Sequence, residues 1–149
     1  MSPGNIDLRV ITQRAAWVRE MIQSIRELPL QDKREFLGSK HHVAAAESYL
    51  RRSLEALFDI GRHILVKKFA SPATEYKEIA QGLAEKEVLT QEESGLMRKM
   101  AGYRNRMVHF YHEISPDELY DLCQSHLAEL SRTLEILLKW VEKNQSQNP

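Results

Sequence analysis

Residues 41–69 read HHVAAAESYLRRSLEALFDIGRHILVKKF, a helical pattern long enough to set the architecture of the whole chain. The apolar positions of its core side are Val43, Leu50, Leu54, Leu57, Ile64 and Leu65. Their spacing keeps them on one face of a helix. Gly61 falls on the same face, where the missing side chain would let another helix approach closely. Ser71 and Pro72 end the pattern, because a proline ring does not fit a helix interior.

A second long helix is predicted on the N-terminal side of this one. Its apolar residues alternate in steps of three and four at Leu8, Ile11, Ala15, Val18, Ile22 and Ile25, which again marks one helical face. Pro29 ends this helix. The charged segment 31–40, which contains Gly38 and Ser39, is expected to be a connection between the two helices.

On the C-terminal side, a short helix is predicted around residues 76–83, and two start signals follow it. Residues 90–93, TQEE, have the spacing of a capping box and predict the start of a fourth helix. Residues 115–118, SPDE, offer a serine cap, a proline at the first helical position and a glutamate that can reach back. The helix that they open is expected to run through a leucine stripe to Val141.

The elements together predict an all-α, up-and-down bundle of about five helices, with two long antiparallel helices and shorter ones between them. The chain has 149 residues, which suits a single domain 1–149 with a core at about residues 6–143 and a frayed tail at 144–149. With 42% hydrophobic and 28% charged residues, it has an ordinary globular composition.

Several classes of protein are disfavoured by the composition. The 21 basic and 21 acidic residues balance, so any attraction to nucleic acid must be local. The one cysteine, Cys123, excludes an internal disulfide and is expected in the core. No stretch reaches the roughly 18 to 20 apolar residues of a membrane span, and no signal-peptide pattern is present. We therefore expect a cytoplasmic protein without membrane contact.

Polar and aromatic residues that can carry chemistry gather in residues 104–111, RNRMVHFY. On a continuous helix, Asn105 and His109 share a face because they are four residues apart, and Arg104 and Tyr111 share the adjacent face. The apolar stripe of this helix is Tyr103, Met107 and Phe110. The polar side chains would thus lie on one side of the helix, and packing of the apolar stripe on the other side would hold them in place.

These residue types suit phosphodiester chemistry. A histidine titrates near neutrality and can move a proton, and an arginine presents a planar fork of donors to a phosphate. No acidic ligand cluster is nearby, which argues against a two-metal nuclease. The remaining route is metal-independent attack by a ribose 2′-hydroxyl, which restricts the substrate to RNA. Because one histidine does not easily serve as base and acid, a symmetric dimer would supply the second.

The local charge agrees with an RNA substrate. Residues 98–112 contain no acid, and their cations and second histidine are candidate RNA contacts: Arg98, Lys99, Arg106 and His112, beside Arg104. Cations of the long central helix would extend this patch: Arg51, Arg52, Arg62, Lys67 and Lys68. Such a patch binds by releasing counterions and is sensitive to salt.

The spacing leaves other interpretations open. Arg104 and His109 would also fit a structural, salt-bridged role. His109 and His112 have the spacing of half a metal site, although no third or fourth ligand is in view, and we expect no metal or cofactor. Asp59 on the long helix is most simply a surface charge, and alternatively it orients Arg104 or His109.

The eight residues 104–111 match the Arg-x4-His-x-Tyr motif of the HEPN superfamily, and the chain resembles its HepT-like toxins. The resemblance extends to three further stretches, residues 54–64, 100–103 and 114–116. It covers roughly residues 6–143.

The resemblance implies a HEPN-type bundle and a small ribonuclease that is the toxin of a toxin–antitoxin module. The resemblance also implies a homodimer in which the motifs of the two copies meet in a cleft. By the motif match, Arg104 and His109 would be the catalytic pair and Asn105 their polar neighbour. Tyr111 matches the tyrosine to which a minimal nucleotidyltransferase (MNT) antitoxin transfers AMP. The added bulk and negative charge would compete with RNA phosphate.

Two alternatives accompany this interpretation. One is a non-catalytic HEPN module that binds nucleotide or RNA, or only pairs with a nucleotidyltransferase. The other is a purely structural helical adaptor. Arg106 is an extra cation within the motif.

Overall fold

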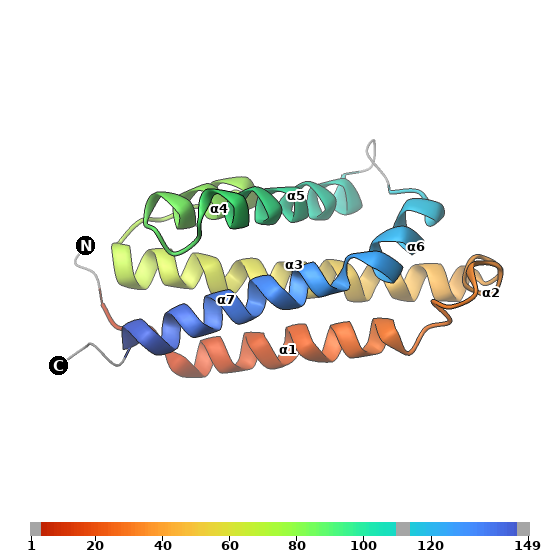
Figure 1. Cartoon of the computed structure of the whole chain (residues 1–149), viewed down its shortest axis with the longest axis horizontal. Coiled ribbons are helices and arrows are strands. Elements are labelled where there is room, and N and C mark those ends of the chain that lie inside the picture. Colours follow the sequence, from red (N-terminus) through yellow and green to blue (C-terminus); the bar gives the residue numbers. More distant parts are fainter. Residues whose placement is uncertain (1–3, 110–113, 146–149) are drawn as a thin grey trace.

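The structure, a computed structural model, describes residues 4–109 and 114–145, and these residues form helices and no strands (Figure 1). The helices are α1 (Leu8–Arg26), α2 (Lys33–Leu37), α3 (Lys40–Phe69), α4 (Tyr76–Glu85), α5 (Gln91–Val108), α6 (Pro116–Ser125) and α7 (Leu127–Gln145). The predicted all-α class is therefore confirmed. None of the described helices is long and apolar enough to cross a membrane.

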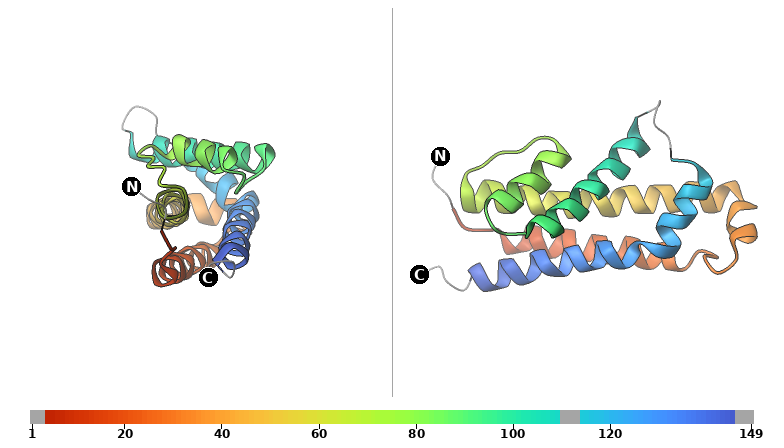
Figure 2. Two further views of the ribbon diagram at one scale, coloured as in Figure 1. Left: turned by 90° about the vertical axis from the view of Figure 1, so that its left-hand side faces the viewer. Right: turned by 45° about the horizontal axis from the view of Figure 1, so that its top comes forward.

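The long helices α1, α3 and α7 lie along one another and form the body of the bundle (Figure 1). α1 and α3 run in opposite directions, as predicted for the two long helices. α4 and α5 lie together on the side of α3 that faces away from α1, which the end-on view of Figure 2 makes plain. α5 therefore brings its C-terminal turns over the middle of α3.

The described residues contain seven helices rather than about five, and one addition is α2, inside the segment predicted as a connection. The Asp32 side chain caps α2 by accepting the backbone N–H groups of Arg34 and Glu35. Phe36 on α2 is fully buried, with its ring 5.3 Å from that of Tyr120 on α6. This short helix was not predicted because its sequence is mostly charged. Its one buried side chain, Phe36, gives no periodic apolar pattern.

The other difference is a bend at His126, which divides the predicted last helix into α6 and α7. The backbone of His126 leaves the helical region at φ −120° and ψ 4°, and its ring Nδ1 lies 3.0 Å from Glu129 Oε1. Cys123 keeps the apolar spacing between Leu119 and Leu127 intact, so no apolar signal marks the bend.

Both predicted start signals are confirmed. Thr90 and Glu93 form a reciprocal capping box, in which each side chain accepts the other's backbone N–H. The Ser115 hydroxyl accepts the Glu118 N–H at 3.2 Å, with Pro116 at the first helical position of α6.

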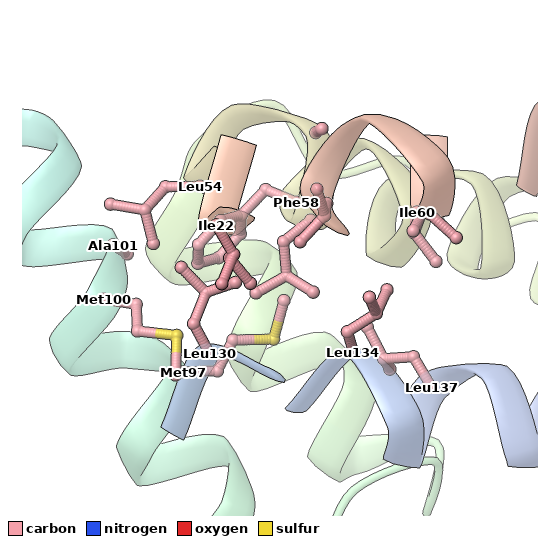
Figure 3. Close-up of a cluster of buried hydrophobic side chains, with 14 of the residues drawn as sticks. Ile22, Leu54, Phe58, Ile60, Met97, Met100, Ala101, Leu130, Leu134 and Leu137 are labelled. Carbon is pink, nitrogen blue, oxygen red and sulfur yellow. The ribbon is translucent and has the colours of Figure 1, made fainter. Parts of the chain in front are cut away.

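The core lies where α1, α3, α5 and α7 meet (Figure 3). The buried side chains labelled there are Ile22, Leu54, Phe58, Ile60, Met97, Met100, Ala101, Leu130, Leu134 and Leu137. The predicted faces of α1 and α3 are buried, apart from Leu8, which is 49% exposed at the first position of α1, and Val43, which is partly buried. Cys123 is in the core as predicted, and burial raises the pKa of its thiol to about 12.

Gly61 confirms its predicted role as a point of close approach. A Cβ atom at this position would lie 2.9 Å from Ile79 Cγ2 and 3.0 Å from Leu83 Cδ1, both on α4. The missing side chain thus lets α4 pack closely against α3. The start of α4, with Tyr76, is thereby held against the central helix.

Candidate active site

The predicted motif begins on α5 and continues past its end. Arg104 and Asn105 are on the last turns of α5, which ends at Val108. His109 is the C-cap, with extended backbone angles of φ −95° and ψ 120°, and its N–H donates to the Asn105 carbonyl at 3.0 Å. The rotation that would align Arg104 with Tyr111 on one helix therefore does not apply. Tyr111 and His112 themselves lie outside the described residues.

One open pocket nevertheless brings together the three described residues of the motif that the sequence analysis assigned to the site. Arg104, Asn105 and His109 line a pocket of about 440 Å³. The opposite wall consists of Arg62 on α3 and residues 74–77 at the start of α4. Helices α3, α4 and α5 thus converge on the motif.

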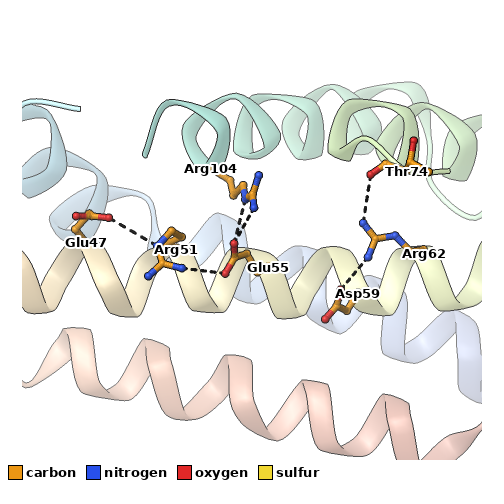
Figure 4. Close-up of polar contacts among 7 residues, drawn as sticks. All are labelled: Glu47, Arg51, Glu55, Asp59, Arg62, Thr74 and Arg104. Carbon is orange, nitrogen blue, oxygen red and sulfur yellow. Dashed lines mark hydrogen bonds and ion pairs between the residues drawn. The ribbon is translucent and has the colours of Figure 1, made fainter. Parts of the chain in front are cut away.

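Arg104 has the most closely defined environment in this pocket (Figure 4). Its Nε and Nη2 atoms both donate to Glu55 Oε2 on α3, at 3.2 and 2.9 Å. Its guanidinium carbon lies 4.3 Å from the centre of the Tyr76 ring, within range of a cation–π interaction. With only 24% of its side chain exposed, Arg104 is held along one edge and against one face.

Asp59 does not contact Arg104. Its carboxylate pairs instead with Arg62 at 3.1 Å and with Arg14 of α1 at 3.3 Å. The acidic partner of Arg104 is Glu55, one helical turn earlier on the same face of α3. Sequence spacing identifies that acidic face, but the turn that lies opposite Arg104 depends on how α5 crosses α3.

Two further residues line the pocket: Arg62, which the sequence predicted only as part of the extended basic patch, and Tyr76, which it did not predict as a site residue. Arg62 donates to the carbonyls of Ala73 and Thr74 at 3.2 and 3.4 Å and so fastens the loop between α3 and α4. Tyr76 follows that loop and supports Arg104, while its own ring packs 5.0 Å from Phe58. The sequence marks Arg62 only as a cation on the polar side of the long helix, three residues from Asp59. Its contacts with the loop carbonyls depend on how the chain folds back after α3.

The basic patch is more nearly neutral than its sequence suggests. Arg106 donates to both carboxylate oxygens of Glu118 at 2.7 and 2.6 Å, which joins α5 to α6. This pairing raises the pKa of Arg106 and lowers the pKa of Glu118. Arg51 is likewise paired, with Glu47 and Glu55.

Other predicted RNA contacts lie away from the pocket. Arg98 and Lys99 are exposed on α5. The Lys99 ammonium lies 6.0 Å from the Tyr103 ring, and Lys99 lines a separate groove between α5 and α7. Among the described residues, no three His, Cys, Asp or Glu side chains are grouped so as to hold a metal ion.

Comparison with known proteins gives related sequences that are nucleases. The sequence profile of the family described as ribonuclease HepT-like matches residues 18–137. The mRNA nuclease HepT of Shewanella oneidensis is 30% identical over 88 residues, which cover 59% of this chain and 66% of that protein, just under two thirds of its length. The tRNA nuclease HepT of Aphanizomenon flos-aquae is 26% identical over 117 residues, which cover 78% of this chain and 79% of that protein.

Solved structures show the same fold. The tri-AMPylated HEPN toxin of Shewanella oneidensis, in complex with MNT antitoxin, superposes with a TM-score of 0.79 at 25% identity over 87% of this chain and 97% of that one. The cytosolic protein YutE of Bacillus subtilis gives a TM-score of 0.79 at 19% identity over 97% and 96% of the two chains, a likeness of fold. Because the family profile covers most of its length, the chain belongs to the HepT-like ribonuclease family.

Proposed function

We propose that this chain is the toxin of a toxin–antitoxin pair, a metal-independent endoribonuclease that acts in the cytoplasm as a homodimer. The observation that carries the proposal is the single pocket lined by Arg104, Asn105 and His109. Family membership supports the ribonuclease activity. The two curated relatives are named for mRNA and for tRNA, so both substrates belong in the assay.

The proposed reaction is attack of a ribose 2′-oxygen on the adjacent phosphorus. His109 accepts the 2′-hydroxyl proton, and Arg104 donates to the phosphate oxygens, where negative charge accumulates in the transition state. The bond from phosphorus to the 5′-oxygen breaks, leaving a 2′,3′-cyclic phosphate and a 5′-hydroxyl. His109 of a second copy supplies the proton for the departing oxygen, which makes the dimer part of the mechanism.

Metal independence is supported by the donors that the pocket offers. Its described lining includes guanidinium, amide and imidazole groups, and Glu75 as its one carboxylate. A two-metal site needs several carboxylates to hold its ions, and the described lining does not provide them.

The test is cleavage of a mixture of tRNA and mRNA in EDTA by the wild type, Arg104→Ala and His109→Ala. We expect cleavage by the wild type and a loss of at least about a hundredfold in either variant. His41→Ala is the matched control, because His41 is an exposed histidine at the start of α3. Full activity in His109→Ala, or none in the wild type, would contradict the proposal.

Silencing of the toxin is proposed to occur at Tyr111. The similar Shewanella structure is of a tri-AMPylated toxin with MNT antitoxin, which supports a nucleotidyltransferase as the partner of this chain. With that partner and ATP, intact-mass spectrometry should show added AMP on the wild type. Tyr111→Phe should show none, and an unchanged mass increase in this variant would exclude Tyr111 as the acceptor.

A second candidate function is a non-catalytic HEPN module that binds nucleotide or RNA, or only pairs with a nucleotidyltransferase. The ion pair between Arg104 and Glu55 favours it, because two of the donor groups of the arginine are already occupied. This candidate predicts RNA binding without cleavage, and no effect on growth when the protein is expressed alone.

A further inference from the structure

We propose that Glu55 is a positioning residue, which fixes the orientation of Arg104 so that its remaining donors meet the scissile phosphate. This inference rests on the proposed ribonuclease function. It concerns a residue outside the Arg-x4-His-x-Tyr motif, 49 positions away from Arg104 in the chain. Figure 4 shows the two side chains reaching toward each other between α3 and α5.

Within the part of the chain that the structure describes, the contact with Glu55 engages one edge of the guanidinium and leaves the other edge available. Arg104 uses Nε and Nη2, both directed at the single oxygen Oε2 of Glu55. A guanidinium has five N–H donors, and among the described residues the hydrogen bonds of Arg104 go only to Glu55. Glu55 thus holds the inner edge of the fork, and no described residue hydrogen-bonds to Nη1 or to the second hydrogen of Nη2 on the outer edge.

The Tyr76 ring completes the constraint. The contact with Glu55 limits rotation in the plane of the guanidinium, and the ring at 4.3 Å limits movement out of that plane. Long side chains such as arginine lose considerable entropy on being ordered. Here that cost is met in the folded chain before RNA arrives, which is how a preorganised site lowers a barrier.

Glu55 also forms an ion pair with a second arginine, which argues against its competing with the RNA phosphate for Arg104. Its second oxygen, Oε1, accepts Nη1 of Arg51 at 3.2 Å, and Arg51 in turn faces Glu47 at 3.8 Å. The carboxylate is therefore shared between two arginines. A carboxylate balanced in this way repels an incoming phosphate less than an isolated one.

The decisive variant is Glu55→Gln, because both carboxylate oxygens accept hydrogen bonds from arginines. A glutamine has one oxygen, so its NH2 group must face either Arg51 or Arg104, and the geometry is lost with little change in size. We expect kcat for RNA cleavage to fall about tenfold to a hundredfold, with KM changed less than about threefold. Glu55→Ala should give a loss at least as large.

The matched control is Glu135→Gln, which removes another interhelical contact, between Arg19 of α1 and Glu135 of α7, at 2.6 Å. Its kcat should equal that of the wild type. Thermal melting of each variant separates a loss of folding from a loss of positioning. A rise in kcat/KM for Glu55→Gln would identify Glu55 as an inhibitor of phosphate binding and overturn the proposal.

A second readout is independent of RNA cleavage. The Nε–H proton of Arg104, assigned by its absence in Arg104→Lys, should give a slowly exchanging NMR signal in the wild type and a rapidly exchanging one in Glu55→Gln. Unchanged exchange together with unchanged kcat would overturn the proposal. If the wild type cleaves no RNA, the proposed function fails and the catalytic role of Glu55 fails with it. The NMR signal then still decides whether Glu55 orients Arg104.

Discussion

At the level of single residues, the environment of Arg104 explains why one motif supports two interpretations. The structural interpretation holds in part, since Arg104 forms an ion pair with Glu55 at 2.9 Å. In the catalytic interpretation, the N–H donors on the outer edge of Arg104 bind the phosphate of the substrate. A motif search finds Arg104 but not Glu55 or Tyr76, because these two residues approach it only through the packing of three helices.

Tyr76 provides a test of the contact with the face of Arg104. Tyr76→Leu removes the aromatic ring and should lower kcat by about fivefold, in line with the ~0.5–2 kcal/mol of a cation–π interaction. Tyr76→Phe keeps the ring and should remain close to the wild type. The measurement is single-turnover RNA cleavage. An equal loss in both variants would assign the effect to the phenol hydroxyl rather than to the ring.

At the level of elements, the starts of α5 and α6 were predictable and the end of α5 was not. Thr90 and Ser115 have side chains that accept the first N–H groups of α5 and α6, a local effect that sequence spacing reveals. The end of α5 at Val108 carries no such signal, because the apolar spacing continues through Met107 to Phe110. The next helix, α6, begins at Pro116 and runs in a different direction from α5 (Figure 1).

The position of α4 depends on Gly61. Gly61→Ala should destabilise the protein by about 1–3 kcal/mol, because the new methyl would overlap Ile79 and Leu83. Gly95→Ala on α5 is the control, since no atom lies within 4 Å of a Cβ built there. It should stabilise by up to ~1 kcal/mol through helix propensity. Urea unfolding of both variants provides the measurement, and equal midpoints would contradict the close approach.

The start of α1 is fastened to α3 by a titratable contact. The Asp7 N–H donates to His63 Nε2 at 2.9 Å, so this nitrogen must be unprotonated. Burial, and then the charge of Lys67, lower the pKa of His63, against the opposing effect of Asp7. The contact therefore contributes stability above the ordinary histidine pKa of about 6.5, and this is lost as pH falls through the lowered value.

The measurement is the free energy of unfolding across pH 5 to 8 for the wild type and His63→Gln. A glutamine retains an acceptor that does not titrate, so the variant should lose part of the decline at low pH. Identical pH profiles would show that His63 does not contribute to it.

At the level of the whole molecule, the proposed mechanism needs two copies. Because the His109 imidazoles of both copies act in one reaction, a heterodimer of the wild type and His109→Ala lacks either the base or the acid and should lose at least about a hundredfold in cleavage. In mixtures that exchange subunits, cleavage should therefore track the population of wild-type homodimers alone. Light scattering provides the mass, and a monomeric mass would contradict the dimer.

The buried thiol of Cys123 opens a practical route to that question. Maleimides and spin labels react with thiolates, and a thiol whose pKa is about 12 offers almost none at neutral pH. Because the one cysteine of the wild-type chain should not react with these labels, a cysteine introduced elsewhere can be labelled selectively. Lys77→Cys, at the exposed rim of the pocket, would place one reporter on each protomer, and the distance between the paired reporters would measure how closely the two pockets face each other.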